Sequence, residues 1–287
     1  MQTYPNIEHI IIDDCSTDDS VKKIEKWINE QNYDCIFIKK NKNYGLSKSL
    51  NESIDLAKGK YWSGLATDDI MVPERTRLFV DFLEQNIATP MVASDTAFIN
   101  DRSERISYHG FESGIRYFTN SINNPDLEKE FGTYRSLILG NYIPASIFIR
   151  TSAFEKAGKY DTSLKMEDWD MWLRISRMCG RISYIDKYLT LYRVHNNNSI
   201  SNTKIMNRDY IKVLLNQKKF AGNYQLLTEY RYHLASLVTH NLKERNYIIV
   251  GKLLLCGSFI LVGKKILGFV WTRIKQKLNS ILRILLK

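Results

Sequence analysis

Two pairs of adjacent acidic residues each follow an apolar stretch of the sequence. Asp13 and Asp14 close the run "HIIIDD", and Asp68 and Asp69 close the run "GLATDD". Adjacent carboxylates repel one another unless a positive charge lies between them, and hard oxygen ligands of this kind suit Mg²⁺ or Mn²⁺. The two pairs therefore indicate a divalent-cation site, with ordinary turn or helix-capping acids as the alternative.

A third acidic cluster lies among aromatic residues in the stretch "KMEDWDMWLRI". Glu167, Asp168 and Asp170 are interspersed there with Trp169 and Trp172. A carboxylate beside packed aromatic rings is shielded from water, which raises its pKa toward the range that proton abstraction near neutral pH requires. The helical spacing of the tryptophans favours core packing, with a binding surface as the alternative for Trp169. For Asp168, the alternative to a chemical role is a first-turn acid at a helix N-terminus.

The elements that must position these acids follow a β-α-β-α-β order over the first 70 residues. Short apolar runs alternate with amphipathic stretches, which is typical of a parallel sheet covered by helices. Ligands bind such sheets beyond the carboxyl ends of the strands, where both acidic pairs fall. The predicted elements are strand 9–14, helix 16–30, strand 34–40, helix 46–59 with Gly59 as its cap, and strand 60–69.

The α/β pattern continues to about residue 203. We expect an irregular excursion at 100–140, because its polar and aromatic residues follow neither a helix nor a strand period. The other predicted elements are helix 73–86, strand 91–99, strand 145–150, helix 151–158, helix 167–180 and two short strands within 182–195.

Charge divides the chain at about the same point. The 287 residues carry a net charge of +10, and residues 204–287 hold 16 basic and 3 acidic residues. Residues 1–203 hold the remaining 25 basic and 28 acidic residues, a net charge of −3. We therefore predict two domains, a catalytic α/β domain over 1–203 and a basic, amphipathic helical region over 204–287.

The basic region favours two kinds of partner. Apolar residues recur at helical spacing after residue 266, which suits an interfacial helix on an anionic membrane surface. Packing on the first domain or on a second subunit of a homodimer is the alternative. Aromatic residues are not interleaved with the charges there, so we expect no nucleic-acid partner.

Targeting signals and cysteine spacing bear on the compartment. The first residues have neither the basic start nor the apolar segment of a signal peptide, and the apolar run at 253–263 is too short to span a bilayer. The four cysteines have no CxxC spacing and indicate reduced thiols. We expect a cytoplasmic protein, with peripheral contact at the inner face of the cell membrane if the C-terminal helix is interfacial.

Four motifs in order resemble those of the inverting nucleotide-sugar glycosyltransferases of family 2. They are "QTYPNIEHIIIDDCSTDDS", "NYGLSKSLNESIDLAKGKYWSGLATDDIMVPERT", "KMEDWDMWLRI" and "YRVHNNNS". The resemblance spans about residues 2–200. It implies a Rossmann-like nucleotide-diphospho-sugar transferase fold of the GT-A type, a mostly parallel central sheet with flanking helices, here followed by the C-terminal helical extension.

The resemblance also implies roles for the residues that match the motifs. Asp13 and Asp14 correspond to the pair that reads the nucleotide base. Asp68 would contact the ribose or the metal, and Asp69 would hold a Mn²⁺ or Mg²⁺ ion on the diphosphate. In the "ED" motif, Asp168 would be the catalytic base.

Further matches are weaker. Glu167 lies beside the base, and Trp169 would contact the acceptor. His195 of "YRVH" would be a metal or phosphate contact, with a structural loop histidine as the alternative. Lys48 would be a weak diphosphate-side cation, because Leu50 occupies the position where many members of the family have arginine.

The implied activity is transfer of a sugar from a nucleotide-diphosphate sugar, expected to be a UDP-sugar, to the hydroxyl of a glycan or lipid-linked acceptor. Inversion by one metal-assisted displacement fits a base on one side of the sugar and a Lewis acid on the other. Synthesis of a cell-surface polysaccharide or glycan is the expected setting.

Two departures from the family keep alternatives open. An opening strand of the type "VSVIIPTYN" is absent, and Ala66 stands at the first acidic position of the usual "DADD". We therefore consider a truncated, inactive relative that binds a membrane or a partner. A receiver-type phosphoacceptor domain, which also gathers acids around Mg²⁺, is a further alternative, although it would end near residue 120.

Overall fold

The computed structural model describes residues 1–107, 129–138 and 140–195, with a few positions between 209 and 220. The chain divides into two compact units, Met1–Met206 and Asn207–Lys287. The predicted helices of residues 204–287 lie almost wholly outside the described residues, as does most of the predicted excursion. Among the described residues, no helix is both long enough and apolar enough to cross a bilayer.

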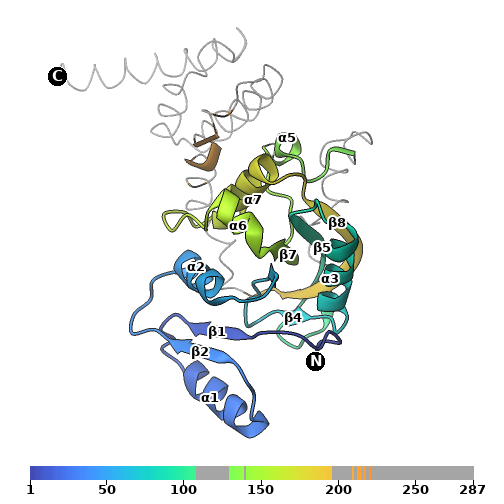
Figure 1. Cartoon of the computed structure of the whole chain (residues 1–287). Helices are drawn as coiled ribbons and strands as arrows, with labels where there is room; N and C mark the ends of the chain where they lie inside the picture. The colour runs from blue at the N-terminus through green and yellow to red at the C-terminus, as the bar shows by residue number, and fades with distance from the viewer. Residues whose placement is uncertain are drawn as a thin grey trace, which may run out of the picture. The chain divides into compact units, whose positions relative to one another are not determined.

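Helices and strands alternate along the first unit, as Figure 1 shows. They are β1 (Ile10–Asp13), α1 (Ser20–Gln31), β2 (Ile36–Lys39), α2 (Leu46–Leu56), β3 (Tyr61–Trp62), β4 (Ile70–Met71), α3 (Arg75–Gln85), β5 (Met91–Ile99), β6 (Arg105–Ile106), α5 (Tyr134–Leu137), β7 (Ile147–Arg150), α6 (Thr151–Ala157), α7 (Glu167–Met178) and β8 (Ser183–Arg193).

The strands form two separate sheets. β1 and β2 pair in parallel, with Ile10 opposite Ile36. The main sheet has the order β3-β7-β5-β8-β4, and β6 pairs with β5. Within it, β5 and β8 run parallel, whereas the other described pairs are antiparallel.

The predicted α/β class is confirmed, but the prediction of a mostly parallel sheet is wrong because the main sheet is mixed. Strand direction cannot be read from the sequence period, since parallel and antiparallel strands both present side chains with a period of two. The two short strands predicted within 182–195 are the single strand β8. Its register with β5 shifts on both sides of Asp95, which bends the pair without ending it.

Two further boundaries differ from the prediction. The expected strand 60–69 is only Tyr61–Trp62, and the acids that follow lie in a turn before β4. The second helix ends at Leu56, with Ala57 as its C-cap, so Gly59 does not cap it. The loop over residues 63–69 is therefore held by contacts from elsewhere in the fold.

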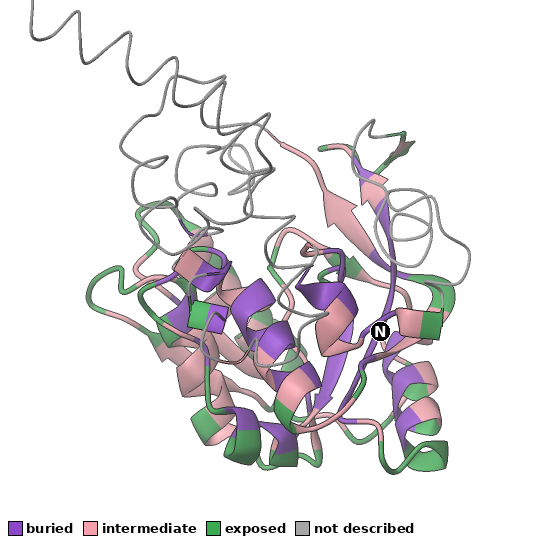
Figure 2. Ribbon diagram, turned by 90° about the horizontal axis from the view of Figure 1, so that it is seen from above, coloured by how far each residue is buried: buried purple, intermediate pink, exposed green. Residues whose placement is uncertain are grey.

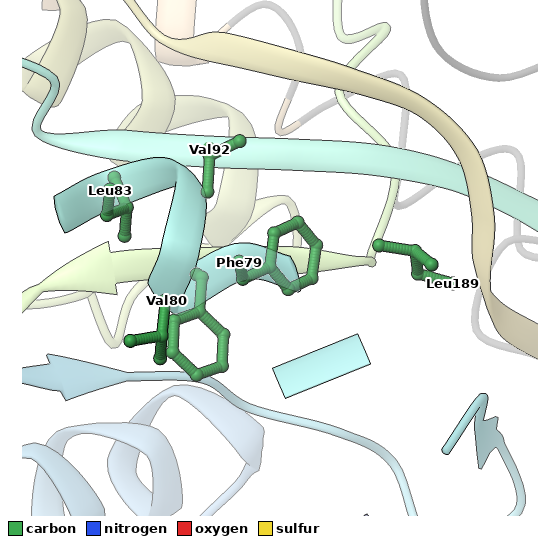
Figure 3. Close-up of a cluster of buried hydrophobic side chains, with 6 residues drawn as sticks. Phe79, Val80, Leu83, Val92 and Leu189 are labelled. Atoms are coloured by element: carbon green, nitrogen blue, oxygen red, sulfur yellow. The ribbon is translucent and has the colours of Figure 1, made fainter. Parts of the chain in front are cut away.

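A core of apolar side chains joins α3 to the main sheet. Figure 3 shows Phe79, Val80 and Leu83 of α3 together with Val92 and Leu189 from two strands. The ring of Phe79 stacks on that of Phe148 in β7, with centroids 5.3 Å apart and planes 18° from parallel. Buried positions gather along strands and inward helix faces, whereas loops and outer turns are exposed (Figure 2). This core fixes the strands that carry the acidic loop.

Candidate active site

Asp168 lies in the first turn of α7, and two donors hold its carboxylate. The side-chain amide of Asn141 donates to Oδ2 at 2.9 Å, and the backbone N–H of Trp169 donates to Oδ1 at 2.6 Å. Burial raises the pKa of Asp168, and the two hydrogen bonds oppose that rise. A fixed carboxylate with a raised pKa is what a general base requires.

The residues next to Asp168 in the sequence lie in different environments. Trp169 is fully buried, and its indole N–H donates to the carbonyl of Leu137 at 2.7 Å. A ring without exposed surface supports core packing, the first of the two predicted roles for Trp169, over contact with an acceptor. Asp170 is also buried and pairs with Arg174 at 2.8 Å. Glu167 keeps part of its surface exposed beside Asp168.

The first acidic pair lies after β1, and its two members are held differently. Asp13 is buried, and its carboxylate accepts hydrogen bonds from the backbone N–H and the hydroxyl of Ser16. The Asp14 carboxylate accepts from the backbone N–H of Tyr44 at 3.1 Å and of Gly45 at 2.6 Å. Asp13 thus closes the turn after β1, while Asp14 ties that turn to the start of α2.

Lysine side chains lie around the corner that Asp14 forms between the turn after β1 and the start of α2. Partial burial raises the pKa of Asp14, but the hydrogen bonds from Tyr44, Gly45 and Lys40 outweigh it, and the pKa lies below its ordinary value. The Lys40 ammonium lies 3.4 Å from Asp14 and is itself largely buried. Lys48 is exposed, with its ammonium 5.1 Å from the centre of the Tyr44 ring. Lys40, which sequence reasoning missed, is therefore the cation in contact with Asp14.

Helix α2 is tied to the segment that leads into α7. The side chain of Asn51 accepts from the N–H of Tyr160 at 2.8 Å and donates to its carbonyl at 2.9 Å. The Ser47 hydroxyl donates to the carbonyl of Leu164 at 3.4 Å. These contacts bring the corner around Asp14 to the chain just before Asp168, although more than 100 residues separate them in sequence.

The second acidic pair meets the end of β8. The Asp69 carboxylate accepts from the N–H of Arg193 at 2.9 Å, and the Arg193 guanidinium donates to the carbonyl of Asp68 at 2.9 Å. The imidazole Nε2 of His195 lies 2.9 Å from Oδ2 of Asp68. Pairing of β4 with β8 thus brings together the residues that the sequence assigned to a metal. Arg193, which it did not assign, holds both acids in place.

The chemistry of Asp69 fits a divalent cation. Burial raises its pKa to about 6, and the charge of Asp68 adds to this rise, while the N–H of Arg193 lowers it. The electrostatic effects of Arg193 and His195 also lower the pKa of Asp69 but do not outweigh its burial, and a bound cation would stabilise the ionised form further. Among the described residues no group of three or more His, Cys, Asp or Glu side chains could hold a metal. An ion there would need further oxygen ligands, such as those of a diphosphate.

A buried arginine supports the loop that carries this pair. Arg75 at the start of α3 has no exposed surface, and burial lowers its pKa to about 10. Its guanidinium donates to the hydroxyls of Ser63 at 2.9 Å and Thr190 at 3.1 Å, and to the carbonyl of Ile147 at 3.1 Å. It therefore links β7 and β8 of the main sheet to the loop that leaves β3.

Comparison with known proteins identifies the family. A model of the family described as glycosyl transferase family 2 matches residues 1–158, more than half of the chain. The chain belongs to this family. The receiver-type alternative is therefore wrong.

Several family members and one solved structure are similar over most of this glycosyltransferase. An uncharacterized glycosyltransferase of Methanocaldococcus jannaschii is 25% identical over 80% of this chain and 71% of its own length. The UDP-Glc:alpha-D-GlcNAc-diphosphoundecaprenol beta-1,3-glucosyltransferase WfaP of Escherichia coli is 26% identical over 85% of this chain and 88% of its own. The chain spans only 60% and 57% of relatives from Haemophilus influenzae and Rickettsia typhi.

The solved structure supports the fold alone. The mannosyltransferase PcManGT of Pyrobaculum calidifontis, in complex with GDP-Man and Mn²⁺, is 12% identical and superposes with a TM-score of 0.56. The superposition covers 92% of this chain and 80% of that one. The GT-A type of fold that the motifs implied is thereby confirmed.

Sequence reasoning missed four residues that position the acids of this glycosyltransferase. They are Lys40, Asn51, Asn141 and Arg193. Arg193 stands within the quoted motif "YRVH" and Asn51 within the second motif, so their places were visible but their partners were not. Lys40 follows β2 directly, a position where strand ends carry functional residues. Asn141 lies in a segment without any pattern that would single it out.

Proposed function

We propose that this glycosyltransferase transfers a sugar from a nucleotide-diphosphate sugar to an acceptor hydroxyl with inversion. The observation that carries the proposal is the carboxylate of Asp168, fixed by two donors and given a raised pKa by burial. As the acceptor oxygen attacks C1 of the donor sugar, its proton passes to Asp168. The bond from C1 to the diphosphate oxygen breaks, and the nucleoside diphosphate leaves.

Asp69 and Asp68, with His195 beside them, would hold a divalent cation against the donor diphosphate. The raised pKa of Asp69 supports this assignment. When bound, such an ion supplies Lewis-acid stabilisation of the leaving diphosphate. Asp14 and Lys40 lie at the corner that would face the nucleotide, and the contacts of Asn51 and Ser47 keep this corner beside the segment that carries the base.

Similar proteins support the substrate class. The name of the Escherichia coli relative gives UDP-glucose as donor and a lipid-linked diphosphate sugar as acceptor, and the Pyrobaculum structure holds GDP-mannose with Mn²⁺. We infer a UDP-sugar as donor and a glycan or lipid-linked sugar as acceptor, with a role in cell-surface polysaccharide synthesis.

The test measures release of nucleoside diphosphate from UDP-sugars and GDP-sugars by the full chain, with Mn²⁺, with Mg²⁺ and with a chelator. We expect metal-dependent release, and an anomeric configuration opposite to that of the donor when NMR follows the product. Calorimetry with UDP and Mn²⁺ separates binding from turnover. Binding without turnover for any donor and acceptor tried would favour the inactive relative over the enzyme.

A further inference from the structure

Asn141 contacts the candidate base with one end of its side-chain amide, and the other end has no partner among the residues that the structure describes. Its Nδ2 donates to Oδ2 of Asp168 at 2.9 Å. Its Oδ1 is buried and has no hydrogen-bond partner among the described residues. Buried polar atoms in folded proteins are nearly always paired, so an unpaired one calls for an explanation.

Asn51 provides a contrast within the same fold. Both ends of its amide are paired with the backbone of Tyr160, at 2.8 and 2.9 Å. An asparagine that serves folding in this way satisfies its donor and its acceptor together. Asn141 instead directs its N–H group at Asp168, and its oxygen finds no partner within the described part of the chain. This arrangement favours a role at the carboxylate over a role in folding.

The segment that carries Asn141 is anchored on both sides. The adjacent Tyr142 is buried, and its hydroxyl accepts from the N–H of Gly132 at 2.9 Å and lies 2.6 Å from the hydroxyl of Ser136. On the other side, the Trp169 indole donates to the carbonyl of Leu137. The end of α5 and the start of α7 are thereby held together, so the amide of Asn141 meets Asp168 in a defined orientation.

We propose that Asn141 is the positioning residue for the base, in that its amide fixes the Asp168 carboxylate and favours the ionised form that accepts the proton of the acceptor hydroxyl. This inference rests on the proposed function. The amide N–H can donate only to a carboxylate oxygen that is free to accept, which is the state that the base must have before the reaction.

Other charged and titratable groups lie near Asp168, but burial is what raises its pKa. Glu167 and Asp170 lie on the same helix, and Asp170 is paired with Arg174. The Tyr160 hydroxyl belongs to the segment before α7 and interacts electrostatically with Asp168, Glu167 and Arg174. Burial disfavours ionisation of Asp168, while the N–H groups of Asn141 and Trp169 favour it.

The experiment replaces Asn141 by leucine, which has a similar volume and no N–H group, and by alanine as a second variant. We expect the acidic limb of the pH profile of kcat/KM to move to higher pH by about one unit, with about tenfold loss below the limb and recovery above it. NMR of ¹³C-labelled aspartate carboxyls, with Asp168 assigned through Asp168→Asn, should show the same displacement of its titration.

The controls keep this proposal separate from the proposed function. Asn86→Ala removes an exposed amide that donates to the carbonyl of Phe82. It should leave the pH profile of kcat/KM and the NMR titration of Asp168 unchanged. If the wild-type chain turns over no donor, the proposed function fails, and the NMR titration still decides the effect of Asn141 on Asp168. A uniform loss of activity at all pH values with an unmoved titration overturns the proposal. Failure of both variants to fold overturns it as well, because it makes Asn141 a folding residue.

Discussion

The two sheets of the first unit differ sharply in burial. All but one of the nine residues of β5 in the main sheet are buried, whereas the three isoleucines of β1 keep part of their surface exposed. α7 buries seven residues and α1 buries none. Helix α7, which carries Asp168, is therefore held by core packing, whereas Arg193 of β8 holds the second acidic pair and the N–H groups of Tyr44 and Gly45 hold Asp14.

From this difference in burial we expect the two regions that carry the proposed site to differ in stability. A carboxylate fixed by a packed helix keeps its orientation, which proton transfer requires. A corner fixed by hydrogen bonds to a loop can adjust when a nucleotide enters, since low-stability segments open more easily. We therefore expect the main sheet to determine turnover and the small sheet to determine donor affinity.

The largest expected effect separates the two regions by kinetics. Asp168→Asn should lower kcat by about 10²- to 10⁴-fold, because the acceptor proton loses its base, and should leave the affinity for UDP unchanged. Asp14→Asn should instead weaken UDP binding, with a smaller change in kcat. Steady-state kinetics and calorimetry measure both. Asp55→Asn, at an exposed pair with Lys159, is the matched control. Equal effects of the first two variants on kcat would remove the distinction between the regions.

The next largest effect compares the two sheets by stability. Phe79→Ala should lower the free energy of unfolding by about 3–5 kcal/mol, since it empties a stacked core position. Ile11→Ala in β1 should cost roughly 1 kcal/mol, because the side chain is already partly exposed. Urea unfolding followed by circular dichroism provides both values. Equal losses would show that the two sheets share one core.

A smaller effect concerns Asp69 and depends on pH. Its pKa of about 6 in the folded chain exceeds the ordinary value of 3.8, so the folded state prefers the protonated form. The stability that this proton contributes is complete below pH 3.8 and is lost as the pH rises through 6. Without divalent ions, Asp69→Asn should therefore stabilise the chain at pH 7.5 by roughly 1–2 kcal/mol, after allowance for solvent screening.

Thermal unfolding at two pH values checks this prediction. The difference between Asp69→Asn and wild type should disappear near pH 4, where both side chains are neutral. Mn²⁺ with UDP should raise the melting temperature of the wild-type chain more than that of the variant. An Asp69→Asn variant that is less stable than wild type at pH 7.5 would show that the ionised Asp69 carboxylate does not destabilise the folded chain.

The smallest effect lies in the small-sheet region. Asn32 ends α1 in the left-handed conformation, with φ of 47°. Asn32→Ala should cost about 1 kcal/mol, because alanine tolerates this conformation poorly. Hydrogen exchange should become faster in α1 while exchange in α7 stays the same. Faster exchange in α7 as well would show that the two regions unfold together.

Much of the fold class followed from local patterns. Apolar periodicity located most helices and strands, because burial of one face repeats every 3.6 or 2 residues in any tertiary context. The acidic motifs predicted which carboxylates could take part in chemistry, since residue type and order are properties of the chain. The direction and pairing of strands did not follow from the sequence, because pairing joins segments that are distant along it. The prediction of a strand over 60–69 was wrong for a related reason. Contacts of Arg75 and Arg193 hold the loop 63–69, and the strand propensity of its own residues does not decide its conformation.

By itself, the sequence determined which acids could act and where along the chain they stand. Only the tertiary structure decided how each acid is used. Asp168 and Trp169 are adjacent in sequence, yet the Asp168 carboxylate accepts a hydrogen bond from the Asn141 amide, whereas the Trp169 side chain is enclosed in the core. Asn141 acquired its place from the packing of α5 against α7. A pKa depends on burial and on partners brought from afar, and no residue carries that information before the chain folds.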